Sequence, residues 1–210
     1  MSLITATFAR EQIPSLSGNG EDALLDTLIA AVSAAFARHC GYPPATWGSD
    51  PTMTATTYTR RLTGDGSRTL TLDVWPVLQK SDVTEVRVDP TLDFTDDIYL
   101  VDAAEYALVP DHPGQLQLLS TSTQGRWSRL PDAIQVICTA GYPVTAGVVD
   151  DSGLQQAAKW AVRSWYDSRK TQGVSQVTHD INTTQFRDEE ILSPQVKQLL
   201  GRYRLPRVVL

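Results

Sequence analysis

Three clusters of acidic residues are the groups in this sequence whose type and spacing could support chemistry. They are Asp96-Asp97, Asp150-Asp151 and Asp188-Glu189-Glu190. Two carboxylates at a fixed separation can serve a glycosidase, and the same oxygens can bind Ca²⁺. Adjacent acids in loops are more often solvated surface, and no loop has the alternating ligand spacing of a calcium site. We therefore predict neither a catalytic residue nor a metal ligand among them.

The histidines, cysteines and glycine-rich turns also give no indication of a catalytic or metal site. His39, His112 and His179 are far apart and are never paired at metal spacing. Cys40 and Cys138 each fall on a predicted apolar face, so we expect buried free thiols. No serine stands in a nucleophile-elbow pattern, and no glycine-rich turn has the strand-to-helix context of a phosphate site. The sequence predicts a protein that is not an enzyme and that uses no cofactor and no metal.

Composition narrows the class of partner. With 210 residues and 41% hydrophobic content, the chain is expected to form one domain, or one domain with an insertion. The net charge of −6 argues against a general nucleic-acid binder but is compatible with a surface past which DNA slides. The first residues lack the features of a signal peptide, and no apolar run approaches the length of a membrane span. We expect synthesis in a cytoplasm and no membrane partner.

Helices are predicted at both ends of the chain. Apolar residues recur at helical spacing from residue 24 to Cys40, and Gly41 with the following prolines ends that stretch. A second stripe at 3, 4 and 7 spacing runs over residues 154–166. Ser193 and Pro194 mark the start of a short final helix, as an N-cap and a first helical residue. The polar stretch 173–190 predicts a loop or arm.

Between these helices the period changes to two. Residues 58–63 and 68–72 flank a glycine-containing turn and predict a β-hairpin. Further strands are expected near residues 83–88, 106–109, 115–118 and 134–139. Gly141 and Pro143 should stop the last of them. The fold class predicted is α+β: a helical core from residues 1–45 and 150–210, with an antiparallel β-sheet inserted at about residues 52–142.

Two features invite a partner. Trp160 lies on the second predicted helix but off its apolar stripe, so it is either an exposed interface anchor or packed under the β-insertion. The C-terminus is basic on an acidic protein and ends in an apolar run, which suits docking onto another chain, the alternative being a frayed end. The predicted interface residues are Trp160, Arg163, Arg202, Tyr203, Arg204, Leu205, Arg207, Val208, Val209 and Leu210.

The order of these elements resembles the head–tail connector (adaptor) proteins of long-tailed bacteriophages and related gene transfer agents. The likeness covers nearly the whole chain. Its motifs are Leu3-Ile4-Thr5, Cys40-Gly41, Leu70-Thr71-Leu72, Trp75-Pro76-Val77, Val83, Val86, Trp127, Pro131, Ala133-Ile134-Gln135-Val136, Gly141-Tyr142, Ala157, Ala158, Trp165, Tyr166, Arg169, Val196, Leu200 and Tyr203. The resemblance implies a structural virion protein that forms a dodecameric ring beneath the portal and joins capsid to tail.

The resemblance also implies the partners and the location. Residues 1–210 would form a single connector domain that binds the portal protein, a neck, stopper or tail protein, and further copies of itself, while DNA passes the channel without specific binding. It would be made in the cytoplasm of a bacterial host and act at the head–tail interface of the virion. Three alternatives remain open: another neck protein such as a stopper or tail-completion protein, a carbohydrate- or peptide-binding module on the β-insertion, and a carboxylate-based hydrolase.

Overall fold

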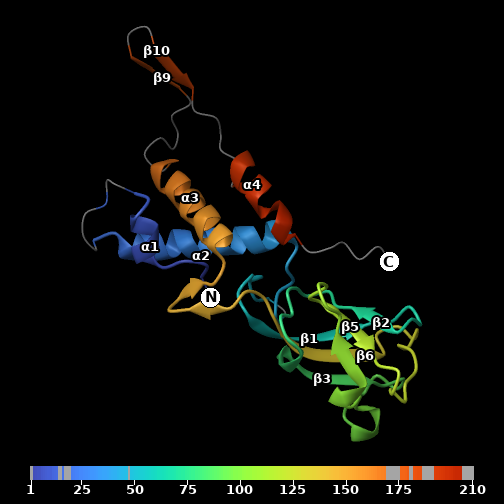
Figure 1. The fold of residues 1–210 in the computed structure, drawn as a ribbon. Helices are drawn as coiled ribbons and strands as arrows, with labels where there is room; N and C mark the ends of the chain where they lie inside the picture. The colour runs from blue at the N-terminus through green and yellow to red at the C-terminus, as the bar shows by residue number, and fades with distance from the viewer. Residues whose placement is uncertain are drawn as a thin grey trace. The chain divides into compact units, whose positions relative to one another are not determined.

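A computed structural model describes residues 2–13, 16, 20–46, 48–168, 176–179, 182–185 and 192–204 (Figure 1). The chain divides into two compact units, and each has its own core. Residues 1–41 and 143–204 form one, called here the helical unit, and residues 42–142 form the other, called the β unit. The α+β class is confirmed, with helices from both chain ends packed together and antiparallel sheets inserted between them. That the whole chain acts as a single connector domain stays a prediction.

The centre of the helical unit is α2 (Asp22–Cys40). Its buried residues recur every three or four positions and form one continuous face, which packs against α1 (Ala6–Arg10) and α3. The helix ends as predicted: Gly41 has φ 85° and its amide donates to the carbonyls of Ala37 and Arg38. Only a residue that tolerates a left-handed backbone closes a helix in this way, which explains the glycine.

The length of α2 corrects one expectation. It has 19 residues with a mean hydropathy of 1.3, so by length and composition alone it could cross a membrane, contrary to the prediction that no apolar run approaches that length. Its alanines account for the discrepancy, because they raise hydropathy without forming the large apolar side chains of a typical span. A helix at the centre of a helical unit passes the same test, and Leu25, Ile29 and Phe36 are buried in this one.

Two further helices complete this unit. In α3 (Ser152–Ser168) the predicted stripe is buried from Leu154 to Tyr166, and α4 (Pro194–Leu200) packs beside it. Ser193 caps α4 as predicted, its Oγ accepting from the Val196 amide at 3.4 Å. α1 and the two-residue strands β7 (Val144–Thr145) and β8 (Val148–Val149) were not predicted from the sequence, because they are too short to show a period.

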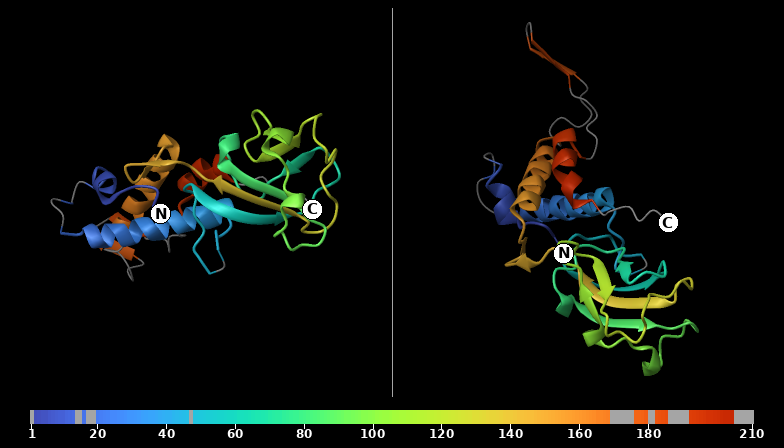
Figure 2. Two further views of the ribbon diagram at one scale, coloured as in Figure 1. Left: turned by 90° about the horizontal axis from the view of Figure 1, so that it is seen from below. Right: turned by 45° about the vertical axis from the view of Figure 1, so that its right-hand side comes forward.

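The β unit holds two three-stranded antiparallel sheets. One has the order β1-β6-β3, formed by β1 (Thr56–Leu62), β6 (Ile134–Ala140) and β3 (Val83–Val88), and Figure 2 shows β6 between its two neighbours. The other has the order β2-β5-β4, formed by β2 (Thr69–Thr71), β5 (Gln115–Leu118) and β4 (Tyr106–Leu108). Side chains of β6 alternate between buried and half-buried, as its sequence period predicts. Trp127, Tyr58 and Tyr106 are the largest side chains in the core between these strands.

The predicted hairpin of residues 58–63 and 68–72 is wrong. β1 pairs with β6, and β2 pairs with β5, so the two strands belong to different sheets. The segment around Trp127 is the physical reason. The Gly64 amide donates to the Ser128 carbonyl at 2.8 Å, and the Trp127 amide donates to the Ser67 carbonyl at 2.9 Å. A distant segment therefore takes the hydrogen bonds that the hairpin would have used.

Part of the polar stretch 173–190, which was predicted to form a loop or arm, is β-strand. Within it, β9 (Gln176–His179) pairs with β10 (Asn182–Gln185) in an antiparallel two-stranded sheet. Both strands contain β-branched residues, which favour extended backbone. The rest of the stretch lies outside the described residues.

Candidate assembly interface

Each described acidic cluster has a structural task. The Asp96 carboxylate accepts from the Ile98 amide at 3.0 Å and caps a short 3-10 helix, η2 (Asp97–Tyr99), while Asp97 pairs with Arg87 at 3.0 Å. Asp150 accepts from the Thr145 hydroxyl at 2.8 Å. Asp151 caps α3, since its Oδ1 accepts from the Leu154 amide at 2.9 Å. The third cluster, Asp188-Glu189-Glu190, lies outside the described residues.

Histidine and cysteine contacts are equally structural. Cys40 and Cys138 are buried free thiols, as predicted, and burial raises their pKa values to about 11 and about 12. His39 is half-buried, and burial together with the charges of Arg204 and Lys197 lowers its pKa. Within the described part of the chain, no group of three His, Cys, Asp or Glu side chains could hold a metal ion.

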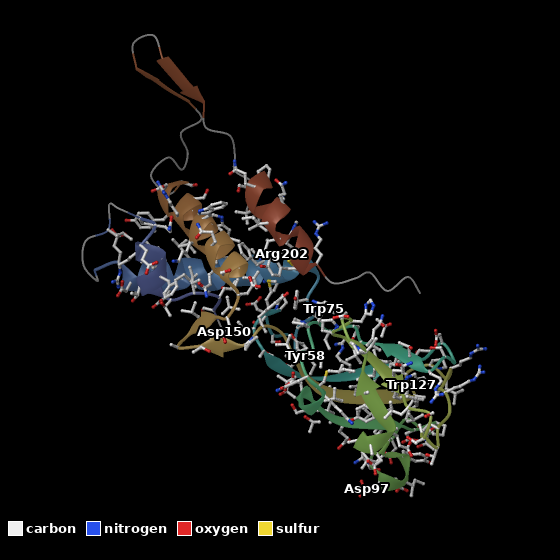
Figure 3. The ribbon with its side chains drawn as sticks, in the orientation of Figure 1. Tyr58, Trp75, Asp97, Trp127, Asp150 and Arg202 are labelled. Atoms are coloured by element: carbon white, nitrogen blue, oxygen red, sulfur yellow. The ribbon has the colours of Figure 1, made fainter. Side chains whose placement is uncertain are left out.

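The C-terminal end of α4 is built around Tyr203. After Leu200 the helix tightens into a 3-10 turn, η4 (Gly201–Tyr203), which directs Tyr203 inward, where it is 3% exposed. Its hydroxyl donates to Asp151 Oδ1 at 2.5 Å and accepts from the Arg202 guanidinium, which also stacks over the Tyr203 ring at 4.6 Å. Arg202 lies 3.6 Å from Asp151, and Figure 3 labels Arg202 within the helical unit. These three side chains thus tie the end of α4 to the start of α3.

The environment of this cluster shifts two pKa values. Burial, followed by the hydrogen bond to Asp151, raises the pKa of Tyr203 to about 12. Burial would raise the pKa of Asp151 too, but the hydrogen bonds from Tyr203 and the Leu154 amide and the charge of Arg202 outweigh it and hold that pKa below its ordinary value. Gly153 leaves room for this packing, because a Cβ there would lie 2.5 Å from the Tyr203 hydroxyl and overlap Arg202.

A Tyr203→Phe substitution should therefore lower the free energy of unfolding by about 1–2 kcal/mol at neutral pH, because it removes a hydrogen bond to a charged group. The folded-state pKa of Tyr203 is raised, so its contribution is complete below pH 10 and is lost as the pH rises toward 12. Urea unfolding at pH 8 and pH 11 should show the difference between the two proteins shrinking at the higher pH. A constant difference would contradict this assignment.

The predicted interface residues separate into three groups. Trp160 is 44% exposed, and Arg163 is exposed and lies 3.7 Å from Asp167, so these side chains share the solvent face of α3. Arg202 and Arg204 are exposed at the end of α4, where Arg204 Nη2 donates to His39 Nε2 at 3.0 Å. Tyr203 is buried in its own unit and positions Arg202. The other predicted residues, Leu205, Arg207, Val208, Val209 and Leu210, lie outside the described residues.

The sequence analysis did not single out the β3–β4 connection, which carries three exposed apolar side chains, Leu92, Ile98 and Leu100. The sequence does contain a signal for this exposed segment. Residues 89–105 contain six acidic residues and no basic residue, and exposed apolar side chains gathered in one short segment are candidates for contact with a partner.

Comparison with known proteins gives a structural likeness. No protein-family profile matches the sequence, and no curated protein matches it. Two solved structures are similar over 99% of this chain. One is a chain in the neck of an empty GTA particle computed with C6 symmetry, with a TM-score of 0.56, 20% identity and 92% of that chain covered. The other is a chain in the neck of a native GTA particle computed with C12 symmetry, with a TM-score of 0.54, 22% identity and 91% covered. At these identities the likeness shows a shared fold, in which both units have counterparts.

Proposed function

We propose that this protein is a structural virion protein, a head–tail connector (adaptor) that forms a ring beneath the portal and joins capsid to tail. Its partners are the portal protein, a neck, stopper or tail protein, and further copies of itself. The observation that carries the proposal is the likeness over 99% of the chain to chains in the necks of GTA particles, one of them computed with C12 symmetry. Since fold alone does not define function, the chemistry of the surface must agree.

The surface supports this proposal. In the two described acidic clusters, Asp96 and Asp151 cap helices, Asp97 pairs with Arg87 and Asp150 accepts from Thr145, so these carboxylates have structural roles. Trp160 on α3 and the arginines at the end of α4 are the exposed aromatic and cationic side chains that interface anchors commonly use. A non-enzymatic role in assembly accounts for both features.

Assembly tests the proposal directly. Subunits in a ring meet through two different patches, and such contacts close only at full symmetry. Mass photometry should therefore show a monomer or a ring, without a stable closed dimer, and cryo-electron microscopy with the purified portal should show a ring on its tail-side face. A twofold dimer at every concentration, or failure to bind the portal, would contradict the function.

Charge leads to a second expectation, that the protein does not retain duplex DNA at physiological salt. A channel wall with an acidic excess repels phosphate and lets the genome pass. Gel shifts with micromolar protein should show free DNA at about 150 mM salt. Salt-sensitive retention would instead assign a DNA-anchoring role to Arg202, Arg204 and Arg207, and the Arg202→Gln variant would then bind more weakly.

A stopper or tail-completion protein is the second candidate. Proteins of those classes are β-rich, and the described α-helices of this chain make up less than a third of its length. The two candidates differ in the ring they touch. The adaptor function proposed here requires binding to the isolated portal, so the binding experiment with portal alone separates the two candidates.

A further inference from the structure

We propose that the β3–β4 connection of one copy docks on the C-terminal end of α4 of the next copy, and that this contact joins neighbouring subunits of the ring. The first surface, called here the acidic loop, is residues 89–102. The second, called the basic helix end, is Lys197, Leu199, Arg202 and Arg204. The inference rests on the proposed function, because it names the contact by which the proposed ring would close.

The acidic loop has a fixed shape. Asp89 is buried at its base, where Oδ1 accepts from the Thr91 amide and hydroxyl, both at 2.7 Å, and Oδ2 accepts from the Asp93 and Phe94 amides at 3.1 and 2.7 Å. These bonds hold Leu92 and Phe94 in the left-handed region, at φ 64° and 58°. A loop already ordered before contact loses little conformational entropy on binding.

The same loop presents apolar side chains to solvent. Leu92 is 42% exposed, Ile98 is 73% exposed and Leu100 is 46% exposed. The loop is fixed along β3, since the Val101 amide donates to the Val86 carbonyl at 2.9 Å and Arg87 donates to the Asp96 carbonyl at 2.9 Å. Figure 3 shows Asp97 at an extremity of the β unit, where another molecule can reach it. A rigid loop that exposes this much apolar surface is suited to a protein partner.

Charge identifies the partner surface. The acidic loop carries five acidic and no basic residues, whereas residues 191–210 carry four basic and no acidic residues. At the basic helix end, Leu199 is 37% exposed and the Arg202 side chain is 64% exposed. The acidic loop thus combines exposed apolar side chains with carboxylates, and the basic helix end combines an exposed leucine with cationic groups. Opposite charges attract the two surfaces and favour one relative orientation.

The complementary surfaces are different patches of one chain, so the contact can repeat head to tail from subunit to subunit and close as a ring when its rotation allows. The same two patches could also meet reciprocally in a twofold dimer, and only the head-to-tail contact gives multimers longer than a dimer. The contact is therefore testable with two variants that each carry a new cysteine in one patch.

Cysteine cross-linking provides the test. The variants are Ile98→Cys, in the acidic loop, and Leu199→Cys, in the basic helix end, both at exposed positions. The native cysteines are buried, and their raised pKa values keep them protonated, so they stay silent under mild oxidation. A mixture of the two variants should yield the disulfide-linked heterodimer in at least about tenfold excess over either homodimer. The double variant should yield a ladder of multimers, and both yields should fall at high salt.

Leu78→Cys is the matched control for Ile98→Cys. Leu78 is 54% exposed in the same unit but lies outside the acidic loop, so its mixture with Leu199→Cys should show no heterodimer excess.

Homodimers as abundant as heterodimers, or a disulfide only within one chain of the double variant, would overturn the proposed contact. If the wild-type protein forms a ring on the portal but the two cysteine variants give no heterodimer excess, the contact is wrong and the connector function stands. Should the cross-link form although the portal is not bound, the contact stands and the connector function fails.

Discussion

Deletion of residues 205–210 is expected to give heads that do not join tails, while the protein keeps its melting temperature. Within the described part of the chain, the last buried apolar residue is Tyr203, which precedes the deleted segment. Pro206 prevents continuation of the helix, and Val208, Val209 and Leu210 favour an extended chain. The basic residue Arg207 can pair with carboxylates on a partner, most simply the portal.

Electron microscopy of particles made with the truncated protein should show filled heads without tails. A tail of the same six residues in scrambled order is the control, because it preserves length, charge and composition. If the scrambled tail restores joining, the charge and hydrophobicity of the tail suffice for docking, and the order of its residues is not needed. If the truncated protein unfolds at a lower temperature, the segment belongs to the core of its own chain and the docking role is wrong.

Substitution of Gly141 by alanine should lower the free energy of unfolding by at least about 3 kcal/mol. Gly141 has φ 114°, and a Cβ there would lie 2.6 Å from the Thr54 carbonyl carbon and oxygen. Both obstructing atoms are backbone and cannot rotate away. Their position is fixed, since the Ala55 amide donates to the Tyr142 carbonyl at 2.8 Å and the Gly141 amide donates to the Pro76 carbonyl at 2.9 Å.

Gly125→Ala is the matched control in the same unit. Gly125 has φ 65° but open space around it, so alanine there meets only the left-handed backbone penalty of about 1 kcal/mol. Urea unfolding followed by tryptophan fluorescence, which reports the buried Trp127, should separate the two variants clearly. Equal losses of unfolding free energy in the two variants would mean that the backbone near Thr54 moves to make room for the Cβ, which would contradict the predicted clash.

The helices were predictable because their signals are local. The buried stripe of α3, the Ser193 cap and the Gly41 ending each depend on residues within a few positions of one another. Strand existence was predictable for the same reason, since the alternation in β6 is continuous over seven residues. Local periodicity therefore decided most of the element types correctly.

Strand pairing was harder to predict because its causes are remote. The turn at residues 64–67 looks like a hairpin, yet the segment around Trp127 bonds to both of its sides, and nothing near the turn indicates this. Similarly, β9 and β10 form in a stretch whose polarity predicted a loop or arm without indicating strands. The proposed interface residues could be chosen by charge and amphipathicity, but their partner atoms belong to other chains and leave no period in this sequence.

The division of the chain also sets an order of folding during synthesis. The core of the β unit is complete once residue 142 has been made, and the pairing of Thr54 with Tyr142 closes that unit at its two ends. The apolar face of α2, in contrast, must wait for α3, which is translated more than a hundred residues later. On the ribosome the inserted unit can therefore fold first, as domains generally do. During that interval Leu25, Ile29 and Phe36 are the natural binding site for a chaperone. Protease treatment of stalled chains in which residue 142 has left the ribosome but α3 has not should cleave α2 while sparing the β unit.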